Sequence, residues 1–213
     1  MIGPTDITAI FGQRGSGKTD MGKALSRLYR RLFVIDVVKD WDRKKDGLEL
    51  VTDDFEVAAD FLEEKIGSPE WRACFRFSVD TSSDHQKKVF NAILRTLYMR
   101  GEITGENVCL LIEEVHMYCS PSTIEEWLFK VITLGRHANI PMIMSSQRPA
   151  QVHKSITSAA SHKFIGQLDD ARDLKYFGEI SAELPAEIQG LKKYDFIYRA
   201  QGEAPRTVNR ESF

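Results

Sequence analysis

The chain has 213 residues, of which 42% are hydrophobic and 28% charged, and these proportions exclude a disordered or collagen-like chain. The formal net charge is −2, so no overall basic field draws the chain onto nucleic acid, and any such contact has to be local. The longest uninterrupted apolar run, residues 108–112, is far too short for a membrane span, and residues 1–6 lack the features of a secretory signal. Three cysteines without a CxxC pair favour free thiols in a reducing compartment. Together these features predict a cytoplasmic protein with no membrane span.

The apolar pattern predicts alternating strands and helices along the chain. A strand at residues 7–11 precedes a helix over 18–30, a strand at 32–35 and a helix over 53–66. A strand at 73–79 then precedes a helix through 89–98, a strand at 108–112, a helix over 124–132 and a strand at 140–144. Two further strands are expected at 162–168 and 194–198. Alternation of this kind, with fully apolar strands, predicts an α/β fold with a largely parallel central sheet and helices on both faces.

Nothing in the sequence divides the chain. No stretch rich in Gly, Ser or Pro separates two halves, and no internal repeat or low-complexity tract is present. We therefore expect a single domain over residues 1–213.

The first chemical signal is a complete GxxxxGK[ST] motif, formed by Gly12, Gln13, Arg14, Gly15, Ser16, Gly17, Lys18 and Thr19. In such a loop, consecutive backbone N–H groups point at phosphate oxygens, and the helix that follows adds its positive end. Lys18 is expected to reach the β- and γ-phosphates of ATP, and the Thr19 hydroxyl is expected to bind Mg²⁺. A glycine-rich surface turn is the alternative, but a predicted strand precedes this motif and a predicted helix follows it.

The second signal is a pair of acids directly after the most apolar strand, Glu113 and Glu114. This position places carboxylates at the C-terminal edge of the sheet, where α/β proteins bind ligands. Hydrolysis of a nucleoside triphosphate needs one carboxylate near the metal and another that orients or deprotonates the attacking water. We assign Glu113 to the metal, with contact through a water ligand, and Glu114 to the water. Solvated acids at a helix N-terminus are the alternative interpretation.

The third signal surrounds the strand expected at 140–144. Gln147 follows this strand and is placed to sense the γ-phosphate or to position water. Arg136 precedes it, at the end away from its own phosphates, and from there it could face the nucleotide of a neighbouring subunit. Taken alone, Arg136 is more often a surface ion-pair residue.

These motifs together resemble the FtsK–HerA superfamily of ring-forming, ATP-driven DNA motors. The resemblance rests on the phosphate loop, the strand with Glu113 and Glu114, the pair Gly135-Arg136, and the closing Ser146-Gln147-Arg148-Pro149. It extends over about residues 7–167, and nothing large is attached, a layout similar to the small genome-packaging ATPases of viruses. The resemblance implies a RecA-like P-loop NTPase fold of the ASCE class, with the Glu113–Glu114 strand beside the phosphate-loop strand.

The same resemblance implies the function. We expect an ATP-driven translocase of double-stranded DNA, a viral genome-packaging motor that acts as a homo-oligomeric ring, with ATP and Mg²⁺ as cofactors. Arg136 of one subunit then completes the site of the next. A capsid or portal-vertex protein is a further candidate partner, and the host cytoplasm or the virion the expected location.

Several alternatives stay open. One is a plasmid-transfer, DNA-end-processing or filamentous-phage morphogenesis ATPase of the same superfamily. Another is a monomeric nucleotide switch or small-molecule kinase. The candidates for the DNA contact are Lys39, Arg43, Lys44 and Lys45, together with Lys192 and Lys193. By contrast, Arg27, Arg30 and Arg31 are expected on a solvated helix face. His116 is expected in packing or beside the site rather than on a metal.

Overall fold

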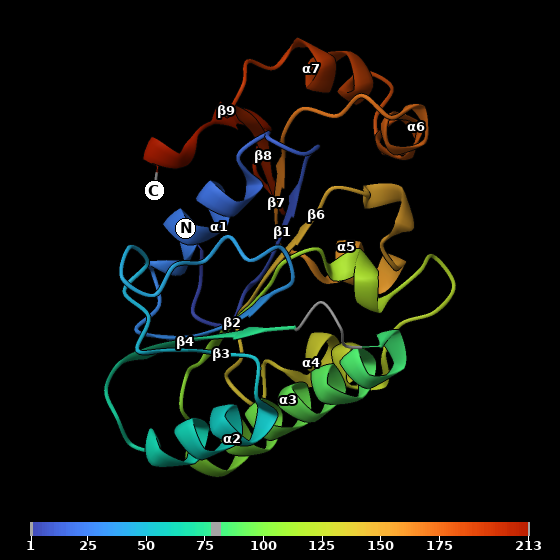
Figure 1. Ribbon diagram of the computed structural model, residues 1–213. Coiled ribbons are helices and arrows are strands. Elements are labelled where there is room, and N and C mark those ends of the chain that lie inside the picture. The colour runs from blue at the N-terminus through green and yellow to red at the C-terminus, as the bar shows by residue number, and fades with distance from the viewer. Residues whose placement is uncertain (1, 78–81, 213) are drawn as a thin grey trace.

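A computed structural model describes residues 2–77 and 82–212 (Figure 1). Within these residues, nine strands form one sheet in the order β3-β4-β2-β5-β6-β1-β7-β8-β9. The strands are β1 (Ile7–Phe11), β2 (Arg31–Asp36), β3 (Leu50–Thr52), β4 (Trp71–Arg76), β5 (Cys109–Ile112), β6 (Met142–Ser146), β7 (His162–Ile165), β8 (Phe196–Ala200) and β9 (Arg206–Val208). The helices are α1 (Lys18–Ser26), α2 (Phe55–Glu64), α3 (Ser83–Thr104), α4 (Glu126–Leu134), α5 (Lys154–Ala159), α6 (Ala171–Gly178) and α7 (Leu184–Gly190), with short 3-10 turns η1 (Val115–Tyr118), η2 (Pro149–Gln151) and η3 (Arg210–Ser212).

The sheet is parallel from β3 to β7 in the lateral order, and β8 runs in the opposite direction, so that it pairs antiparallel with both β7 and β9. Its central strands are buried on both faces: Leu110 and Ile112 of β5 belong to one apolar core, and Cys109 and Leu111 to the other. Helix α1 covers one face through Met21 and other residues, while α2 to α7 pack on the opposite face (Figure 1). The predicted α/β class, with a largely parallel sheet and helices on both faces, is confirmed.

One expectation about the sheet is wrong. The strand that precedes Glu113 does not lie beside the phosphate-loop strand, because β6 is inserted between them and pairs with both. β6 is as thoroughly buried as β5, so the apolar pattern alone does not distinguish the lateral order of the two strands.

Some boundaries also differ from the predicted ones. α1 ends at Ser26 rather than near residue 30, since the amides of Arg27, Leu28 and Tyr29 bond to carbonyls three residues back in tight turns. β6 starts two residues later than expected, because the amide of Ile140 is used in a turn with Gly135. The strand predicted at 73–79 corresponds to β4, which begins at Trp71 and ends at Arg76. The last two predicted positions, 78 and 79, lie outside the described residues.

Parallel pairing brings three strand ends together. Phe11 lies opposite Ser146, and Ile112 lies opposite Met144, so the residues that follow β1, β5 and β6 leave the sheet at one edge. This is the edge at which open α/β sheets bind ligands. None of the helices in the described residues has both the length and the apolar character that crossing a bilayer requires.

Candidate active site

The loop between β1 and α1 has the backbone that a phosphate-binding loop requires. Gly17, which caps α1, has φ of 93°, a left-handed conformation that glycine adopts without strain. A Cβ at Gly12 would lie 2.5 Å from Oγ of Ser16, so the loop closes on itself at this point only with glycine. The N-terminus of the nine-residue helix α1 therefore faces the loop with free backbone N–H groups, as anion binding requires.

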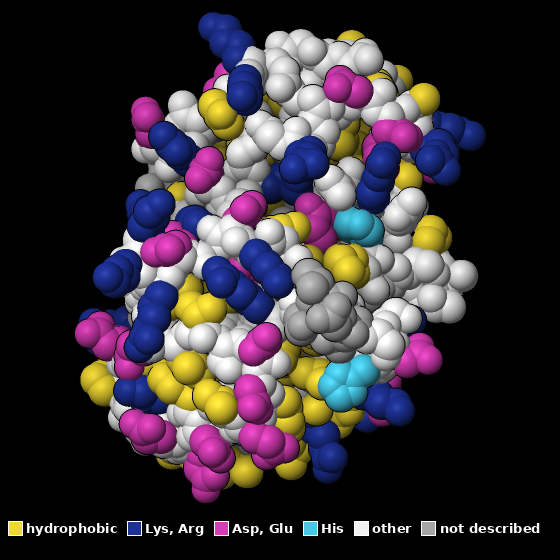
Figure 2. All heavy atoms as spheres, viewed as in Figure 1, with side chains coloured by type: hydrophobic (Ala, Val, Ile, Leu, Met, Phe, Trp, Pro, Cys, Tyr) yellow, Lys and Arg dark blue, Asp and Glu magenta, His cyan; other side chains and the backbone are white. Residues whose placement is uncertain are grey.

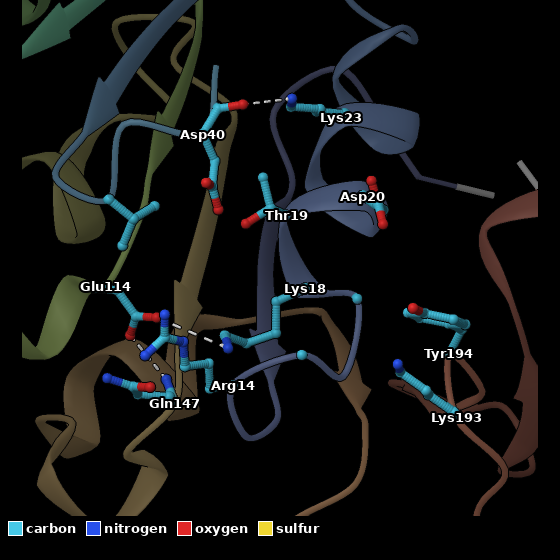
Figure 3. Close-up of a pocket in the computed structure, with 13 residues that line it drawn as sticks. Arg14, Lys18, Thr19, Asp20, Lys23, Asp40, Glu114, Gln147, Lys193 and Tyr194 are labelled. Carbon is cyan, nitrogen blue, oxygen red and sulfur yellow. Dashed lines mark hydrogen bonds and ion pairs between the residues drawn. The ribbon is translucent and has the colours of Figure 1, made fainter. Parts of the chain in front are cut away.

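A cavity of about 670 Å³ opens in front of this loop (Figure 3). It is lined by Arg14, Gly15, Gly17, Lys18, Thr19, Asp20, Lys23, Val38, Asp40, Glu114, Gln147, Lys193 and Tyr194. Its volume is within the range of small-molecule sites. The structure thus brings the phosphate loop, Glu114 and Gln147 to one cavity, although they are far apart in sequence.

Lys18 and Glu114 face each other across the cavity. The Lys18 ammonium lies 3.8 Å from Oε1 of Glu114 and donates a hydrogen bond to the Gln13 carbonyl at 3.2 Å. Burial lowers the pKa of Lys18, and the Glu114 charge offsets only part of this effect. A buried cation whose nearby carboxylates do not fully offset its burial is suited to bind phosphate oxygens, since these replace the hydration that the ammonium has lost.

Glu114 is held in place from three sides. Its backbone adopts a left-handed conformation with φ of 51°. The backbone N–H of Gln147 donates a hydrogen bond to Oε2 of Glu114 at 2.9 Å, and Nδ1 of His116 lies 3.2 Å from the same oxygen. Burial on its own raises the pKa of Glu114, but the His116 contact, the Lys18 charge and the Gln147 amide together hold this pKa below its ordinary value. The carboxylate is therefore ionised and oriented, as an acceptor for the proton of an attacking water must be.

His116 lies beside the site, as the sequence predicted. Its Nδ1 also lies 3.0 Å from Oγ of Ser146, so the imidazole bridges Glu114 and the end of β6. Within the described residues, no cluster of three His, Cys, Asp or Glu side chains is arranged to hold a metal ion.

The structure places Glu113 differently from Glu114. Glu113 is 1% exposed and is not among the residues that line the cavity. Its carboxylate accepts a hydrogen bond from the Trp41 indole N–H at 3.3 Å and another from the Ser145 hydroxyl. Burial raises the pKa of Glu113. The assignment of Glu113 to the metal stays a prediction. In this structure the Glu113 carboxylate already accepts hydrogen bonds from two protein groups, Trp41 and Ser145.

The cavity also presents oxygen ligands for a divalent cation. Thr19 and Asp40 lie on facing elements, with the Asp40 carboxylate turned toward the Thr19 side chain in Figure 3. Mg²⁺ typically takes one or two protein oxygens and completes its shell with nucleotide phosphates and water. This donor set fits such an ion. Asp40 has no predicted role in the site, because only the fold of the segment after β2 brings it there.

Arg136 lies at the opposite edge of the sheet. It is exposed in the turn between α4 and β6, and its charge acts on Asp6, which precedes β1. Since β6 runs in parallel beside β1 and its five residues span roughly 16 Å, Arg136 and the phosphate loop are separated by the full length of these strands. Among the predicted catalytic residues Glu114, Arg136 and Gln147, Arg136 is therefore the one that the fold does not bring to the cavity.

The C-terminal part of the chain supplies two unpredicted cavity residues. Lys193 and Tyr194, in the turn between α7 and β8, project toward the cavity from the side opposite Gln147 (Figure 3). A Cβ on Gly17 would lie 2.9 Å from Cδ1 of Tyr194, so the ring packs directly against the phosphate loop. Lys193 was a candidate for DNA contact, and the structure places it at the cavity instead. The motif pattern stops at residue 167 and gives no signal for either residue.

No protein-family model matches the chain. In a comparison with curated proteins, the chain is 26% identical over 105 residues to the probable DNA double-strand break repair helicase HerA of Methanocaldococcus jannaschii. It is 30% identical over 92 residues to the DNA double-strand break repair helicase HerA of Sulfurisphaera tokodaii. This chain has HerA homologues, at low identity. The matches cover 48% and 41% of this chain and about a fifth of each HerA protein, 21% and 19%.

The fold has a more complete counterpart among solved structures. It superimposes on B204, the DNA-packaging ATPase from Sulfolobus turreted icosahedral virus, with a TM-score of 0.73, 97% coverage of this chain, 98% coverage of B204 and 17% identity. A B204 of Sulfolobus turreted icosahedral virus 2, solved in complex with ATP-gammaS, gives the same TM-score at 15% identity. The predicted P-loop ATPase fold, and its resemblance to the HerA-like ATPases and to small viral packaging ATPases, are therefore confirmed.

Proposed function

We propose that this chain is an ATPase, and the arrangement of Lys18 and Glu114 across one cavity carries the proposal. A closed phosphate loop, an ammonium for the phosphates and an ionised carboxylate for the water meet at one sheet edge. The HerA homologues and the nucleotide-bound structures of B204 support the same activity.

Each site residue then has a chemical role. Backbone amides of residues 12–19 and the Lys18 ammonium bind the β- and γ-phosphates, and Glu114 accepts a proton from the attacking water. Gln147, whose amide fixes Glu114, offers its side chain to the same water or to the γ-phosphate. Thr19, with Asp40 or, through a water ligand, Glu113, would hold Mg²⁺, which would neutralise phosphate charge during transfer.

The hydrolysis is proposed to drive translocation of double-stranded DNA, in a homo-oligomeric ring that packages a viral genome. The match to B204 over the length of both chains supports this role, because no large segment of either chain is left without a counterpart. The exposed position of Arg136 at the far sheet edge suits a residue that serves the nucleotide of a neighbouring subunit. A capsid or portal-vertex protein is the proposed docking partner, in the host cytoplasm or virion.

A second candidate within the superfamily is DNA-end processing. The local identity to two HerA repair helicases favours it. Both candidates require a DNA-dependent ATPase, so they share the first experiment.

The experiment measures ATP hydrolysis by the purified chain with and without linear double-stranded DNA. We expect hydrolysis that requires Mg²⁺ and rises with DNA, and a folded Lys18→Ala control without activity. Hydrolysis that is indifferent to DNA, by a protein that stays monomeric at all concentrations, would favour the nucleotide switch or small-molecule kinase over the motor. To separate packaging from end processing, closed circular DNA is compared with linear DNA, because an end-processing enzyme responds to free ends.

A further inference from the structure

A second cavity of about 620 Å³ lies beside α1, separate from the phosphate loop. Its charged lining residues are Lys23, Arg27, Arg30, Lys45, Arg72, Asp46 and Glu70. Five of these side chains are basic and two are acidic, in a chain whose overall charge is −2. The cavity therefore concentrates positive charge locally, which a chain with a net charge of −2 needs for any contact with nucleic acid.

Three cations at this cavity have no ion-pair partner among the residues that the structure describes. Lys23 is paired with Asp46 at 2.8 Å, which neutralises one acid of the lining. By contrast, Arg27, Arg30 and Lys45 are exposed and form no ion pair with any described residue. Solvated cations without protein partners are free to bind phosphate groups and to release the counterions around them.

Arg72 adds a fixed positive charge to this cavity. Its guanidinium donates to the Ser26 carbonyl at 3.2 Å and to the Ser26 hydroxyl at 2.8 Å, which fixes its charge at the end of α1. Burial lowers the pKa of Arg72, and the neighbouring Arg27 charge acts in the same direction. Like charges held this close repel each other, and a bound polyanion relieves the repulsion.

The segment between β2 and β3 forms the other wall and extends the charge. In its turn, Asp42 accepts hydrogen bonds from the amides of Lys44 and Lys45, which leaves Arg43, Lys44 and Lys45 pointing outward. Figure 2 shows Lys and Arg side chains gathered over the side where α1 and this segment lie, interspersed with acidic ones. The sequence suggested Arg43, Lys44 and Lys45 among its candidate DNA contacts but treated Arg27 and Arg30 as solvated. The fold brings Lys45 to the same cavity as Arg27 and Arg30.

We propose that this cavity, with Arg27, Arg30 and Lys45 on its rim, binds the phosphodiester backbone of double-stranded DNA. The inference rests on the proposed function and assigns its DNA contact to a defined surface. Exposed guanidinium groups bind phosphates in two-pronged geometry, without reading base sequence, as a packaging motor requires.

The structure also connects this surface to the ATP site. Lys23 lines both cavities, and the β2–β3 segment contributes Val38 and Asp40 to the first and Lys45 to the second. Between them, the Trp41 indole binds the Glu113 carboxylate, next to Glu114. DNA bound at Lys45 can therefore bias the position of Asp40 and Glu113, and this link is a route for stimulation of hydrolysis.

The test uses the full chain and a fluorescent DNA duplex of about 30 base pairs, with affinity measured at several salt concentrations. The variant is Arg27→Gln with Arg30→Gln, and the matched control is Lys88→Gln with Lys175→Gln. The control changes net charge equally, at exposed cations on α3 and α6 that form no ion pair with any residue the structure describes. The variant should bind duplex at least about tenfold more weakly, with a salt slope reduced by about 2, because each phosphate contact contributes roughly 0.9. DNA stimulation should fall in parallel, while ATP hydrolysis without DNA and the control variant stay at wild-type values.

The outcomes separate the two proposals. Wild-type affinity and salt slope in the Arg27→Gln, Arg30→Gln variant would overturn the DNA assignment of this cavity and leave the motor proposal standing. A wild-type chain that hydrolyses ATP yet binds no duplex at any salt concentration would overturn both. Equal losses in the variant and its control would show a general charge effect and refute a defined surface.

Discussion

The backbone amide of Gln147 donates a hydrogen bond to Oε2 of Glu114 at 2.9 Å, across the boundary between β6 and β5. The two residues are 33 positions apart in sequence. Gln147 directly follows β6, and Glu114 is the second residue after β5. This contact ties the proposed water-activating carboxylate to the proposed γ-phosphate sensor. Any movement of the end of β6 therefore reaches the Glu114 carboxylate without an intermediate residue.

Glu114→Gln should bind ATP and fail to hydrolyse it. The amide oxygen of glutamine still accepts from the Gln147 backbone, so the local geometry persists, but the side chain no longer accepts a proton. We expect turnover to fall by about 10²- to 10⁴-fold, the usual contribution of a general base. Single-turnover hydrolysis and filter binding of labelled ATP measure the two steps. Hydrolysis at the wild-type rate in a folded variant would remove Glu114 from this role.

Glu113→Gln should raise the Mg²⁺ concentration needed for half-maximal activity and also lower stability. The two oxygens of the Glu113 carboxylate accept one hydrogen bond each, from Trp41 and from Ser145. Glutamine keeps only one of these acceptor oxygens, because its NH₂ group is a donor. We expect a loss of about 1–3 kcal/mol in the free energy of unfolding, measured by urea denaturation.

Asp40→Asn provides the matched comparison for the metal, because Asp40 is exposed and lines the cavity. Its free energy of unfolding should stay near the wild-type value. If Glu113→Gln loses stability with an unchanged Mg²⁺ requirement, while Asp40→Asn raises that requirement, the metal contact belongs to Asp40.

Arg136→Ala should bind ATP normally and hydrolyse it poorly, because the residue is proposed to act on a neighbour's nucleotide. An arginine supplied in trans is worth on the order of 10³-fold in turnover. Mixing Arg136→Ala with Lys18→Ala subunits should restore part of the activity, since one chain contributes the arginine and the other the phosphate loop. If the two kinds of subunit demonstrably form mixed rings and ATP hydrolysis is still not restored, the result contradicts a shared site.

Glu106→Gln should destabilise the fold at neutral pH, far from the site. Arg100 lies 2.7 Å from Oε2 of Glu106, and the Gly67 amide donates to Oε1 at 2.7 Å, with both charged side chains almost fully buried. Removing one partner of such a pair costs about 3 kcal/mol.

The same pair predicts a pH dependence. Burial on its own raises the pKa of Glu106, but the Arg100 and Gly67 contacts outweigh it and leave this pKa below its ordinary value of 4.5. A depressed folded-state pKa adds stability above the unfolded pKa, and this stability is lost as pH falls. The difference between wild type and Glu106→Gln, measured by urea denaturation, should therefore be largest at neutral pH and shrink below about pH 4. A difference that does not change with pH contradicts this account.

Sequence by itself determined the strands that carry the chemistry. β1 and β5 appear where apolar runs end at Gly12 and Glu113, because a strand buried on both faces leaves an unmistakable apolar signal. The phosphate loop is fully local, since its residues are contiguous and its glycines are required by the backbone at Gly12 and Gly17. The α/β class followed from the same alternation.

Tertiary structure decided what depends on contacts between distant segments. The insertion of β6 between β5 and β1, the contact of Trp41 with Glu113 and the arrival of Tyr194 at the phosphate loop leave no mark in local periodicity. Local pattern records which side of an element is buried, whereas lateral order and loop placement are set by the packing of whole faces against each other. For that reason the sequence placed Arg27 on a solvated helix face and Lys45 after the second strand without relating the two, and only the folded chain shows them on the rim of one cavity.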